Sequence, residues 1–408
     1  AVKKLEKFIA GGYIRNIQVD REGEFIMIND FGEKIGGARK DLWKERGLMV
    51  EDLDGMTQGE KENSRRLYEC CFPEDSQKFV DYYYQEKCRD NEIAVIEACG
   101  NIVSMVHANP FTVSCCGTQA EVHYIVAVAT APEYRRRGYM RQLMQQVLRD
   151  CRERGEAFSF LMPANPAYYE PLGYRYWNNQ YVWEFPKKQE LLLKGFCQNP
   201  EYQSDNDPKA LAQMANGILA DQFDLYILRN ASYYERIEKE QESEDGGVYV
   251  WYDEQKTLVG SVFYAKEDGF ELREPILADV RKQQIPDKAS LGKADLDKGN
   301  SDQDKLLLGE RKDDSFYVTE RKKSVMMGRI TDLPAFVQML RSEKPYEEIL
   351  QIRDDILPEN NGIFRIYIDK TGGRAERADA CENARAMDIA TFGQLMFDRL
   401  RIFVNELV

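Results

Sequence analysis

The order of apolar and polar positions predicts alternating strands and helices from about residue 61 onward. Short apolar runs rich in β-branched and small residues, the pattern typical of buried strands, cover residues 92–98, 101–107, 124–130 and 157–162. Between the last two runs, apolar residues recur at helical spacing among polar ones, at Leu143, Met144, Val147, Leu148 and Cys151. The pattern therefore predicts an α/β fold, of the α+β kind with mixed sheets.

Changes in the pattern divide the chain into four expected parts. Residues 1–60 form an appendix of unknown role, in which IGGARK at 35–40 fits either a turn or a phosphate loop. A polar stretch rich in lysine and aspartate covers 279–314. The expected domains are 1–60, 61–186, 187–315 and 316–408, and a final helix is expected over 398–404.

Charge and composition narrow the class of function. The 408 residues carry 56 Lys and Arg against 70 Asp and Glu, a net charge of −14. An acidic chain is poorly suited to nucleic acid or anionic membranes, whereas it attracts cationic ligands. No apolar run reaches the roughly 18 residues of a membrane-spanning helix, and no signal peptide is evident. We therefore expect a cytoplasmic protein that binds neither nucleic acid nor membrane.

Histidine and cysteine narrow the chemistry. Only two histidines, His107 and His123, are present, so we expect neither a metal site nor a histidine relay. The nine cysteines form no CxxC pair, although Cys70–Cys71 and Cys115–Cys116 are adjacent in sequence. Adjacent cysteines fit either a strained redox loop or ordinary reduced thiols, and the second is the simpler interpretation.

One segment, YIVAVATAPEYRRRGYMR at 124–141, carries a candidate binding site. A strand ends there, Pro132 lies in the turn, and a helix begins at Arg-Arg-Arg-Gly. Unpaired amides at a helix start, a glycine that permits close approach and flanking arginines together favour an anion such as phosphate. Taken alone, the same basic helix start also fits a solvated face.

The segment resembles the acetyl-CoA pyrophosphate loop of GNAT-type N-acetyltransferases, which reads Gln/Arg-x-x-Gly-x-Gly/Ala. Arg135 and Gly138 fit that loop, while Met140 replaces its last small residue. The resemblance implies that the cofactor is acetyl-CoA, with its diphosphate bound at Arg136, Arg137, Gly138, Tyr139, Met140 and Arg141. It also implies that the end of the preceding strand contacts the pantetheine and polarises the thioester, at Val128, Ala129 and Thr130.

A second segment, FSFLMPANPAYYEPLGYRYW at 158–177, resembles the GNAT region where the fifth strand parts from the fourth to admit the cofactor. The family places here the tyrosine that protonates the leaving thiolate, which implies that role for Tyr169, with Tyr168 and Tyr174 as rivals. A phenol with a pKa of ~10 suits a thiol with a pKa near ~8.5. Ala164 and Asn165 are also expected to contact the cofactor.

The order of parts resembles the Eis (enhanced intracellular survival) group, whose chains hold an active GNAT domain, a degenerate GNAT domain and a sterol-carrier-protein-like domain. The segment ILQIRDDILPENNGIFRIYID at 349–369 fits the strands of the last of these. The resemblance implies tandem GNAT folds, a homohexamer, and a base supplied by the C-terminal carboxylate, here that of Val408.

The expected function is acetyl-CoA-dependent N-acetylation of a primary amine on a cationic small molecule, of the aminoglycoside kind, by direct attack in a ternary complex. Peptide or protein lysine amines are an alternative acceptor. A different class of alternative is an acyl-CoA- or lipid-binding protein without turnover. A third is an accessory protein that recruits a partner through residues 1–60.

Overall fold

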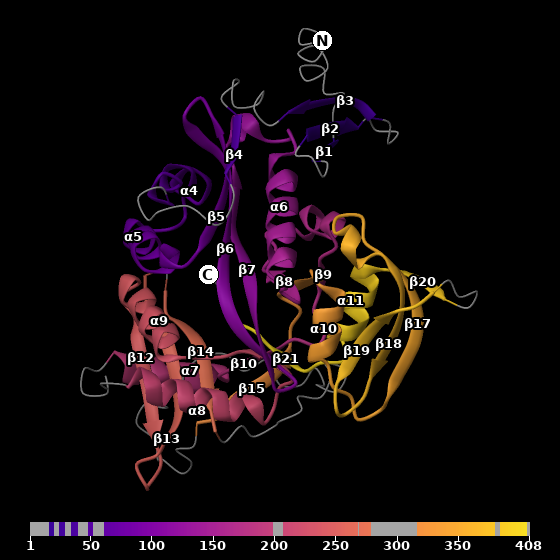
Figure 1. Ribbon diagram of the computed structural model, residues 1–408. Coiled ribbons are helices and arrows are strands. Elements are labelled where there is room, and N and C mark those ends of the chain that lie inside the picture. The colour runs from indigo at the N-terminus through magenta and orange to yellow at the C-terminus, as the bar shows by residue number, and fades with distance from the viewer. Residues whose placement is uncertain are drawn as a thin grey trace, which may run out of the picture. The chain divides into compact units, whose positions relative to one another are not determined.

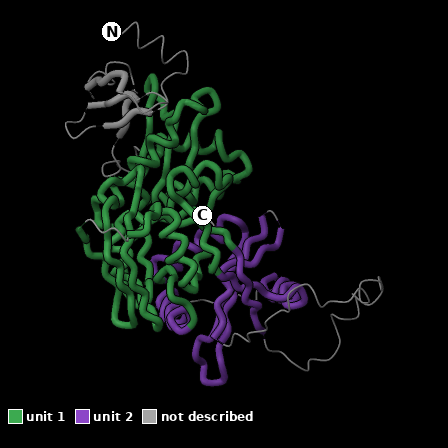
Figure 2. Tube along the Cα trace, turned by 90° about the vertical axis from the view of Figure 1, so that its right-hand side faces the viewer, with its two compact units in different colours: residues 1–180, 222–228, 324–408 green, residues 181–221, 229–323 purple. Residues whose placement is uncertain are grey.

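The computed structural model describes residues 61–198, 207–267, 269–278, 316–379 and 384–405, with the backbone of four strands before residue 61. The chain forms two compact units, each discontinuous in sequence (Figure 2). Unit 1 comprises residues 1–180, 222–228 and 324–408, and unit 2 comprises residues 181–221 and 229–323. The domain boundaries expected from the sequence stay a prediction.

Three of the early strands form an antiparallel sheet of their own. Strand β2 (Glu24–Ile28) pairs with β1 (Asn16–Val19) on one side and with β3 (Lys34–Arg39) on the other. The sequence IGGARK, for which a turn or a phosphate loop was expected, therefore lies largely in strand β3, and both interpretations were wrong.

The main sheet of unit 1 is mixed, and among the described residues it has nine strands (Figure 1). Its order is β21-β11-β6-β7-β8-β16-β9, and β5 pairs with β6 and also with β4. The bounds are β4 Leu48–Glu51, β5 Glu92–Ala98, β6 Asn101–Cys115, β7 Thr118–Thr130, β8 Phe158–Leu161, β9 Arg175–Tyr176, β11 Leu225–Ile227, β16 Met327–Ile330 and β21 Ile402–Phe403.

Both faces of this sheet are covered by helices. Strand β5 alternates in the way that a two-sided sheet requires: Ala94 and Ile96 join the apolar cluster beneath helix α6 (Tyr139–Glu153), whereas Ile93 and Val95 join the cluster of the opposite face. That opposite face is covered by α4 (Arg65–Cys71) and α5 (Gln77–Gln85), as Figure 1 shows. The mixed α/β fold expected from the sequence is confirmed.

Strands β7 and β8 part after a short pairing. They run parallel and pair only from His123–Ser159 to Ile125–Leu161. Beyond Ile125, strand β7 continues to Thr130, and within the described part of the chain it pairs there with β6 alone. Strand β16, which comes more than 160 residues after β8, pairs antiparallel with the other edge of β8 and with β9. The last residues of β7 are therefore unpaired on one side, as expected for this region.

Among the described residues from 333 onward, unit 1 also forms a four-stranded sheet of order β19-β18-β17-β20 with two helices. Their bounds are α10 Leu333–Met339, β17 Tyr346–Arg353, β18 Gly362–Ile368, β19 Gly373–Arg377, β20 Arg385–Asp388 and α11 Ile389–Phe397. The helix expected over 398–404 was wrong. Strand β21 occupies Ile402–Phe403 instead, because it finds a parallel partner in β11, far away in the sequence.

The described residues of unit 2 form three helices, an antiparallel sheet of order β12-β13-β14 and the pair β10–β15. The bounds are β10 Tyr181–Glu184, α7 Lys187–Cys197, α8 Pro208–Ala220, α9 Ala231–Ser243, β12 Gly247–Tyr252, β13 Leu258–Ala265, β14 Glu271–Leu277 and β15 Thr319–Lys322. Whether this unit is a degenerate copy of a domain in unit 1 stays a prediction.

Candidate functional site

The end of strand β7 carries a β-bulge beside the gap between β7 and β8. The register with β6 shifts between the pairs Met105–Ala129 and His107–Val126, so that two residues of β7 face one of β6. Ala127 lies in the bulge with φ 48°, an uncommon value for a residue with a side chain. A bulge takes backbone groups out of the regular ladder. It therefore re-aims the backbone around Val128, one of the residues that the family resemblance implies polarise the thioester.

Ser104 on strand β6 fixes the last two residues of β7. Its hydroxyl donates to the carbonyl of Ala129 at 3.1 Å and lies 2.8 Å from the hydroxyl of Thr130. Ser104 is fully buried, so these bonds are shielded from water. Sequence reasoning missed Ser104, although the register of the hairpin formed by β6 and β7 would have placed it opposite Thr130.

Helix α6 begins with an open, left-handed glycine. Gly138 is its N-cap, with φ 82°, and a Cβ added there would meet nothing within 4 Å. Strain rather than a clash therefore favours glycine at this position. The helical ladder starts with the bond from the Gln142 amide to the Gly138 carbonyl, at 3.0 Å. The amides of Tyr139, Met140 and Arg141 precede that ladder, and the first turn has no acidic residue. The helix start therefore suits an anion.

Two of the four arginines around this helix start are held by the turn itself. Arg135 donates from Nε to the carbonyl of Thr130 at 3.0 Å. Arg137 donates to the carbonyl of Glu133 at 2.9 Å, and its guanidinium lies 4.9 Å from the ring centre of Tyr134. These contacts tie the turn to the strand end, and both side chains remain exposed.

The other two arginines are not engaged. Arg136 and Arg141 are exposed, and neither forms a hydrogen bond or ion pair within the part of the chain that the structure describes. The backbone of Arg136 has φ 62°, a further departure from ordinary conformation in this turn. A basic turn in strained conformation before a helix start is a pattern found where anions bind.

The three candidate tyrosines differ sharply in environment. Tyr174 is fully buried and its hydroxyl lies 2.6 Å from Ser159 Oγ, so it is part of the core. Tyr168 is 62% exposed. Tyr169 is 7% exposed, and its hydroxyl forms no hydrogen bond with any described residue, while its oxygen reaches the surface. Of the three, Tyr169 alone combines an anchored ring with an available hydroxyl.

Tyr169 shares its surroundings with the helix start and the strand end. It belongs to the apolar cluster beneath α6, together with Leu143 and Leu172. Val128 from the end of β7, and Tyr139 and Met140 from the first turn of α6, pack against the same cluster. The structure therefore gathers the three features that the sequence predicted separately.

The structure shows less about the other residues predicted to contact the cofactor or to act as the base, Ala164, Asn165 and Val408. Ala164 and Asn165 are exposed, and Asn165 Oδ1 accepts the amide of Ala167 at 3.0 Å. The segment that follows forms two 3₁₀ turns, Pro166–Tyr168 and Glu170–Leu172. Val408 lies outside the described residues.

An ion pair that the sequence did not reveal anchors the loop of Tyr169. Arg329 on β16 donates from Nε to the carbonyl of Leu172 at 3.1 Å and from one terminal nitrogen to both oxygens of Asp354, at 2.7 and 2.9 Å. Both side chains are 1% exposed. Asp354 also accepts the amides of Ile356 and Leu357 at 3.0 and 3.1 Å. The C-terminal part of unit 1 therefore holds the loop that follows Tyr169.

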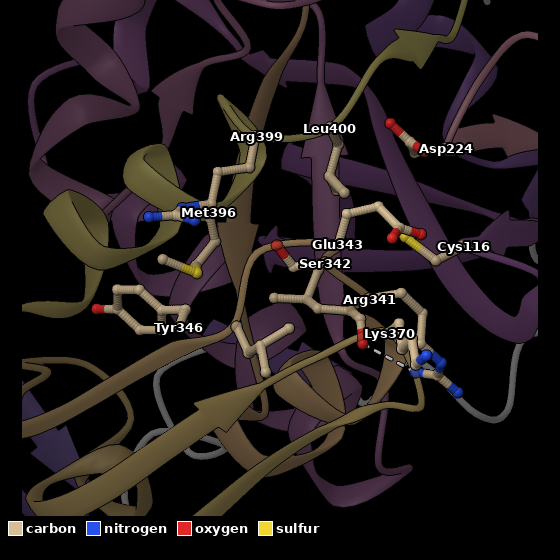
Figure 3. A pocket seen from close by; sticks show the side chains of 12 residues that line it. Cys116, Asp224, Arg341, Ser342, Glu343, Tyr346, Lys370, Met396, Arg399 and Leu400 are labelled. Carbon is tan, nitrogen blue, oxygen red and sulfur yellow. Dashed lines mark hydrogen bonds between the residues drawn. The ribbon is translucent and has the colours of Figure 1, made fainter.

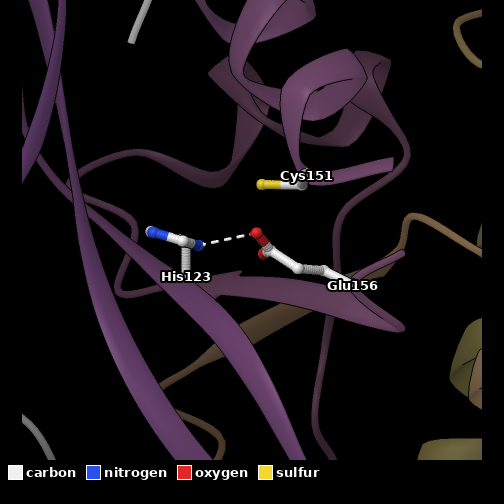
Figure 4. Close-up of side chains that lie close together, drawn as sticks. All are labelled: His123, Cys151 and Glu156. Carbon is white, nitrogen blue, oxygen red and sulfur yellow. Dashed lines mark hydrogen bonds and ion pairs between the residues drawn. The ribbon is translucent and has the colours of Figure 1, made fainter. Parts of the chain in front are cut away.

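A second buried network lies at the other end of helix α6 (Figure 4). His123 Nδ1 is 2.9 Å from Glu156 Oε1, and Arg154 bridges that oxygen at 2.7 Å and Glu92 at 3.0 Å. The ligand atoms of His123, Cys151 and Glu156 lie within 4.8 Å of one another, a spacing that also suits a metal ion. The guanidinium already bound to both carboxylates competes with any cation there, so the contacts define an ion-pair network.

Comparison with known proteins gives two domain matches. The family model for an acetyltransferase (GNAT) domain matches residues 52–177, and that for a sterol carrier protein domain matches residues 333–402. The first match contains the bulged strand, the helix start and Tyr169. The chain therefore contains a GNAT acetyltransferase domain followed by a sterol carrier protein domain. Its acetyl donor is acetyl-CoA.

Solved structures share the fold of this GNAT acetyltransferase at low identity. A GCN5-related N-acetyltransferase from Kribbella flavida is 17% identical, with TM-score 0.60, over 88% of this chain and 98% of that one. Eis1 from Mycobacterium abscessus is 13% identical, with TM-score 0.57, over 86% and 89%. A probable N-acyltransferase from Enterococcus faecalis is 18% identical, with TM-score 0.57, over 86% and 90%.

The curated proteins and the lengths of the helices give two further findings on this GNAT acetyltransferase. None of the curated proteins compared matches its sequence. Within the described residues, no helix has both the length and the apolar character needed to cross a membrane.

Proposed function

We propose that this enzyme transfers the acetyl group of acetyl-CoA to a primary amine of a cationic small molecule, by direct attack in a ternary complex. The observation that supports this most is the environment of Tyr169. Its ring is fixed in the cluster shared with the strand end and the helix start, and its hydroxyl is uncommitted. The thioester of acetyl-CoA supplies the activated acetyl group, and the residues below bind and orient it.

The start of helix α6 is the proposed diphosphate site. The amides of Tyr139, Met140 and Arg141 precede the helical ladder, and the open space at Gly138 lets an anion approach them. Arg136 and Arg141 add two uncommitted positive charges beside them. The half-buried Met140 packs against the cluster beneath α6, so its length is accommodated on the inner side of the turn.

The bulged end of β7 is the proposed site for the reacting carbonyl. We assign the Val128 amide the role of stabilising negative charge on that oxygen, because the bulge removes this stretch from regular pairing. Ser104 holds the next two residues in place through the Ala129 carbonyl and the Thr130 hydroxyl. A fixed donor costs less reorganisation when charge develops than a mobile one does.

The pKa of Tyr169 refines its proposed role. Burial, with a smaller contribution from Tyr168, raises the pKa of Tyr169 to about 12, so the phenol stays protonated at neutral pH. The gap to a thiol of pKa ~8.5 is then about 3.5 units, or roughly 5 kcal/mol against complete proton transfer. Tyr169 therefore acts as a hydrogen-bond donor to the departing sulfur and keeps its proton, and the thiolate takes its final proton from solvent.

The acceptor is proposed from charge. A net charge of −14 favours a cationic amine over an acidic one. The aminoglycoside-like class follows from the resemblance to the Eis group, as do a homohexamer and a cytoplasmic location. Assaying aminoglycosides, polyamines and lysine peptides side by side tests the class, and a preference for the peptides would contradict it.

The test of Tyr169 uses its two neighbours as controls. We expect Tyr169→Phe to lower kcat about 10²-fold. A loss of that size is the upper end for removing a hydrogen bond to a charged group and the lower end for removing a general acid. Affinity for CoA is expected to stay the same. Tyr168→Phe and Tyr174→Phe are expected to leave kcat unchanged, although the second loses the Ser159 contact and some stability. Full activity of Tyr169→Phe would overturn the assignment.

A further inference from the structure

Two hairpin turns of the main sheet share an unusual sequence and conformation. Cys99 and Gly100 connect β5 to β6 with φ values of 53° and 74°, and Cys116 and Gly117 connect β6 to β7 with 48° and 78°. Both residues of such a two-residue turn lie in the left-handed region, where a first residue other than Asn, Asp or Gly is uncommon. Cys99 and Cys116 therefore have the same backbone conformation, so that a difference in their reactivity reports on their surroundings.

Cys99 is exposed, whereas Cys116 is half-buried in the wall of a cavity of about 310 Å³ (Figure 3). The cavity lies wholly within unit 1, at the opposite end of strand β7 from the proposed acetyl-CoA site. Its other walls come from the segments that follow α10, β18 and α11 and from the residues before β11. This volume is at the lower end for small-molecule sites and suits a ligand of a few residues.

The charged side chains of this cavity carry both signs. Positive charge comes from Arg341, Lys370 and Arg399, and negative charge from Asp224 and Glu343. Asp224 accepts the Arg401 backbone amide at 2.8 Å, and the Arg399 guanidinium lies 4.7 Å from the ring centre of Tyr346. No ion pair joins any of these five to another residue within the described ranges. The guanidinium of Arg341 is satisfied only by carbonyls, such as that of Gln338 at 2.9 Å, and by the Thr118 hydroxyl at 3.5 Å. A ligand with more carboxylates than ammonium groups would complement this set.

The thiol of Cys116 is activated by its neighbours. The adjacent Cys115 thiol and, to a smaller extent, the Arg341 backbone amide lower the pKa of Cys116 and together outweigh the effect of burial. The nearby charge of Asp224 opposes this effect, and that of the Arg341 side chain supports it. Cys115 is fully buried and its pKa is raised by the same contact. Cys116 is therefore the nucleophile of the pair, because a thiolate and not a thiol attacks.

We propose that Cys116 is a modification site for a small zwitterionic disulfide rich in carboxylates, of which oxidised glutathione is the probe. Its carboxylates are bound by Arg341, Lys370 and Arg399, and its ammonium group by Asp224 and Glu343. The thiolate of Cys116 attacks one sulfur of the disulfide. The original S–S bond breaks, a new one joins Cys116 to one half, and the other half leaves as a thiolate with the electron pair. The protein sulfur is oxidised and the leaving half is reduced.

The experiment measures adduct formation at both turns in the same folded full-length protein. After exposure to oxidised glutathione, peptide mapping by mass spectrometry is expected to show modification at Cys116 at least about tenfold faster than at Cys99, although Cys99 is more exposed. Cys116→Ser is expected to abolish that adduct, and Cys99→Ser to preserve it. A rate at Cys99 equal to or above that at Cys116 would overturn the proposal.

Two further arms test the charges. Lys370→Gln combined with Arg399→Gln, both exposed positions, is expected to slow the reaction at Cys116 about fivefold or more and leave Cys99 unchanged. Cystamine, a disulfide with ammonium groups and no carboxylate, is expected to show a smaller preference for Cys116, because only the lowered pKa of that thiol still favours it. An unchanged preference in either arm would overturn the assignment of the cavity to a carboxylate-bearing ligand.

Discussion

At the scale of single residues, buried charge is the feature with the clearest consequence. Burial alone would raise the pKa of Glu156, but His123 and Arg154 outweigh it and hold that pKa below its usual value of 4.5. A carboxyl group whose pKa is lowered on folding stabilises the fold above its unfolded pKa, and that contribution disappears as the pH falls through the folded pKa. The contribution of Glu156 is therefore present at pH 7 and begins to decline as the pH falls below about 4.5.

This behaviour gives a direct prediction. Glu156→Gln is expected to lower the free energy of unfolding by about 1.5–3 kcal/mol at pH 7, because it removes the buried carboxylate that His123 and Arg154 contact. The difference from the parent protein is expected to shrink at pH 3.5. Urea unfolding followed by tryptophan fluorescence measures both values. Glu153→Gln, an exposed change next to α6's C-terminus, is the control, and a pH-independent loss at Glu156 would contradict the ion-pair account.

Sequence reasoning at this scale succeeded where chemistry and spacing are local. The strand end, Gly138 and Tyr169 lie within about fifty residues and carry a recognisable order of residue types. It failed for Ser104 and Arg329, because each acts on a backbone group brought near only by sheet pairing. Nor could it show that Arg135 and Arg137 are held by the turn while Arg136 and Arg141 are not.

At the scale of elements, strand β16 connects the C-terminal part of unit 1 to the catalytic sheet. It pairs with both β8 and β9 and carries Arg329 to the Leu172 carbonyl beyond Tyr169. A Cβ at Gly173, which has φ 88°, would lie 3.4 Å from the Arg329 side chain, so the loop and the strand fit closely. We infer that this strand positions Tyr169 for the reaction.

The inference is tested with Arg329→Lys, which keeps the charge beside Asp354 but cannot donate to Leu172 and the carboxylate together. We expect kcat to fall several-fold, by about 1 kcal/mol in activation free energy, with CoA affinity unchanged. Arg229→Lys is the matched control, since Arg229 forms an equally buried pair with Glu274 in unit 2, at 2.7 Å. If both variants lose similar stability and Arg329→Lys keeps its kcat, the ion pair of Arg329 with Asp354 has only a structural role.

The same scale shows why the C-terminal helix was predicted wrongly. Residues 398–404 form a short apolar run, and periodicity cannot separate a strand from a helix over so few residues. Their structure is decided by pairing with β11, about 175 positions earlier, together with the bridge from Gln180 to Ile402. Long, strongly periodic segments such as α6 were predicted correctly because they bury a complete face by themselves.

At the scale of the whole molecule, the sequence predicted the mixed α/β class, the acetyltransferase domain and the sterol carrier protein domain. It did not predict that a segment from residue 324 onward packs into the same unit as the catalytic sheet. Such long-range pairing depends on complementary surfaces that no local pattern records. The proposed activity requires that the start of α6 binds the diphosphate of acetyl-CoA.

Two glycines of one helix test that claim. Gly138 and Gly155 flank α6 with φ values of 82° and 76°, and a Cβ on either would meet nothing within 4 Å. Changing either to alanine is expected to cost about 1 kcal/mol of stability through backbone strain. Calorimetric titration with CoA is expected to show affinity reduced tenfold or more in Gly138→Ala and unchanged in Gly155→Ala. Equal affinity in the two variants would contradict the proposed site.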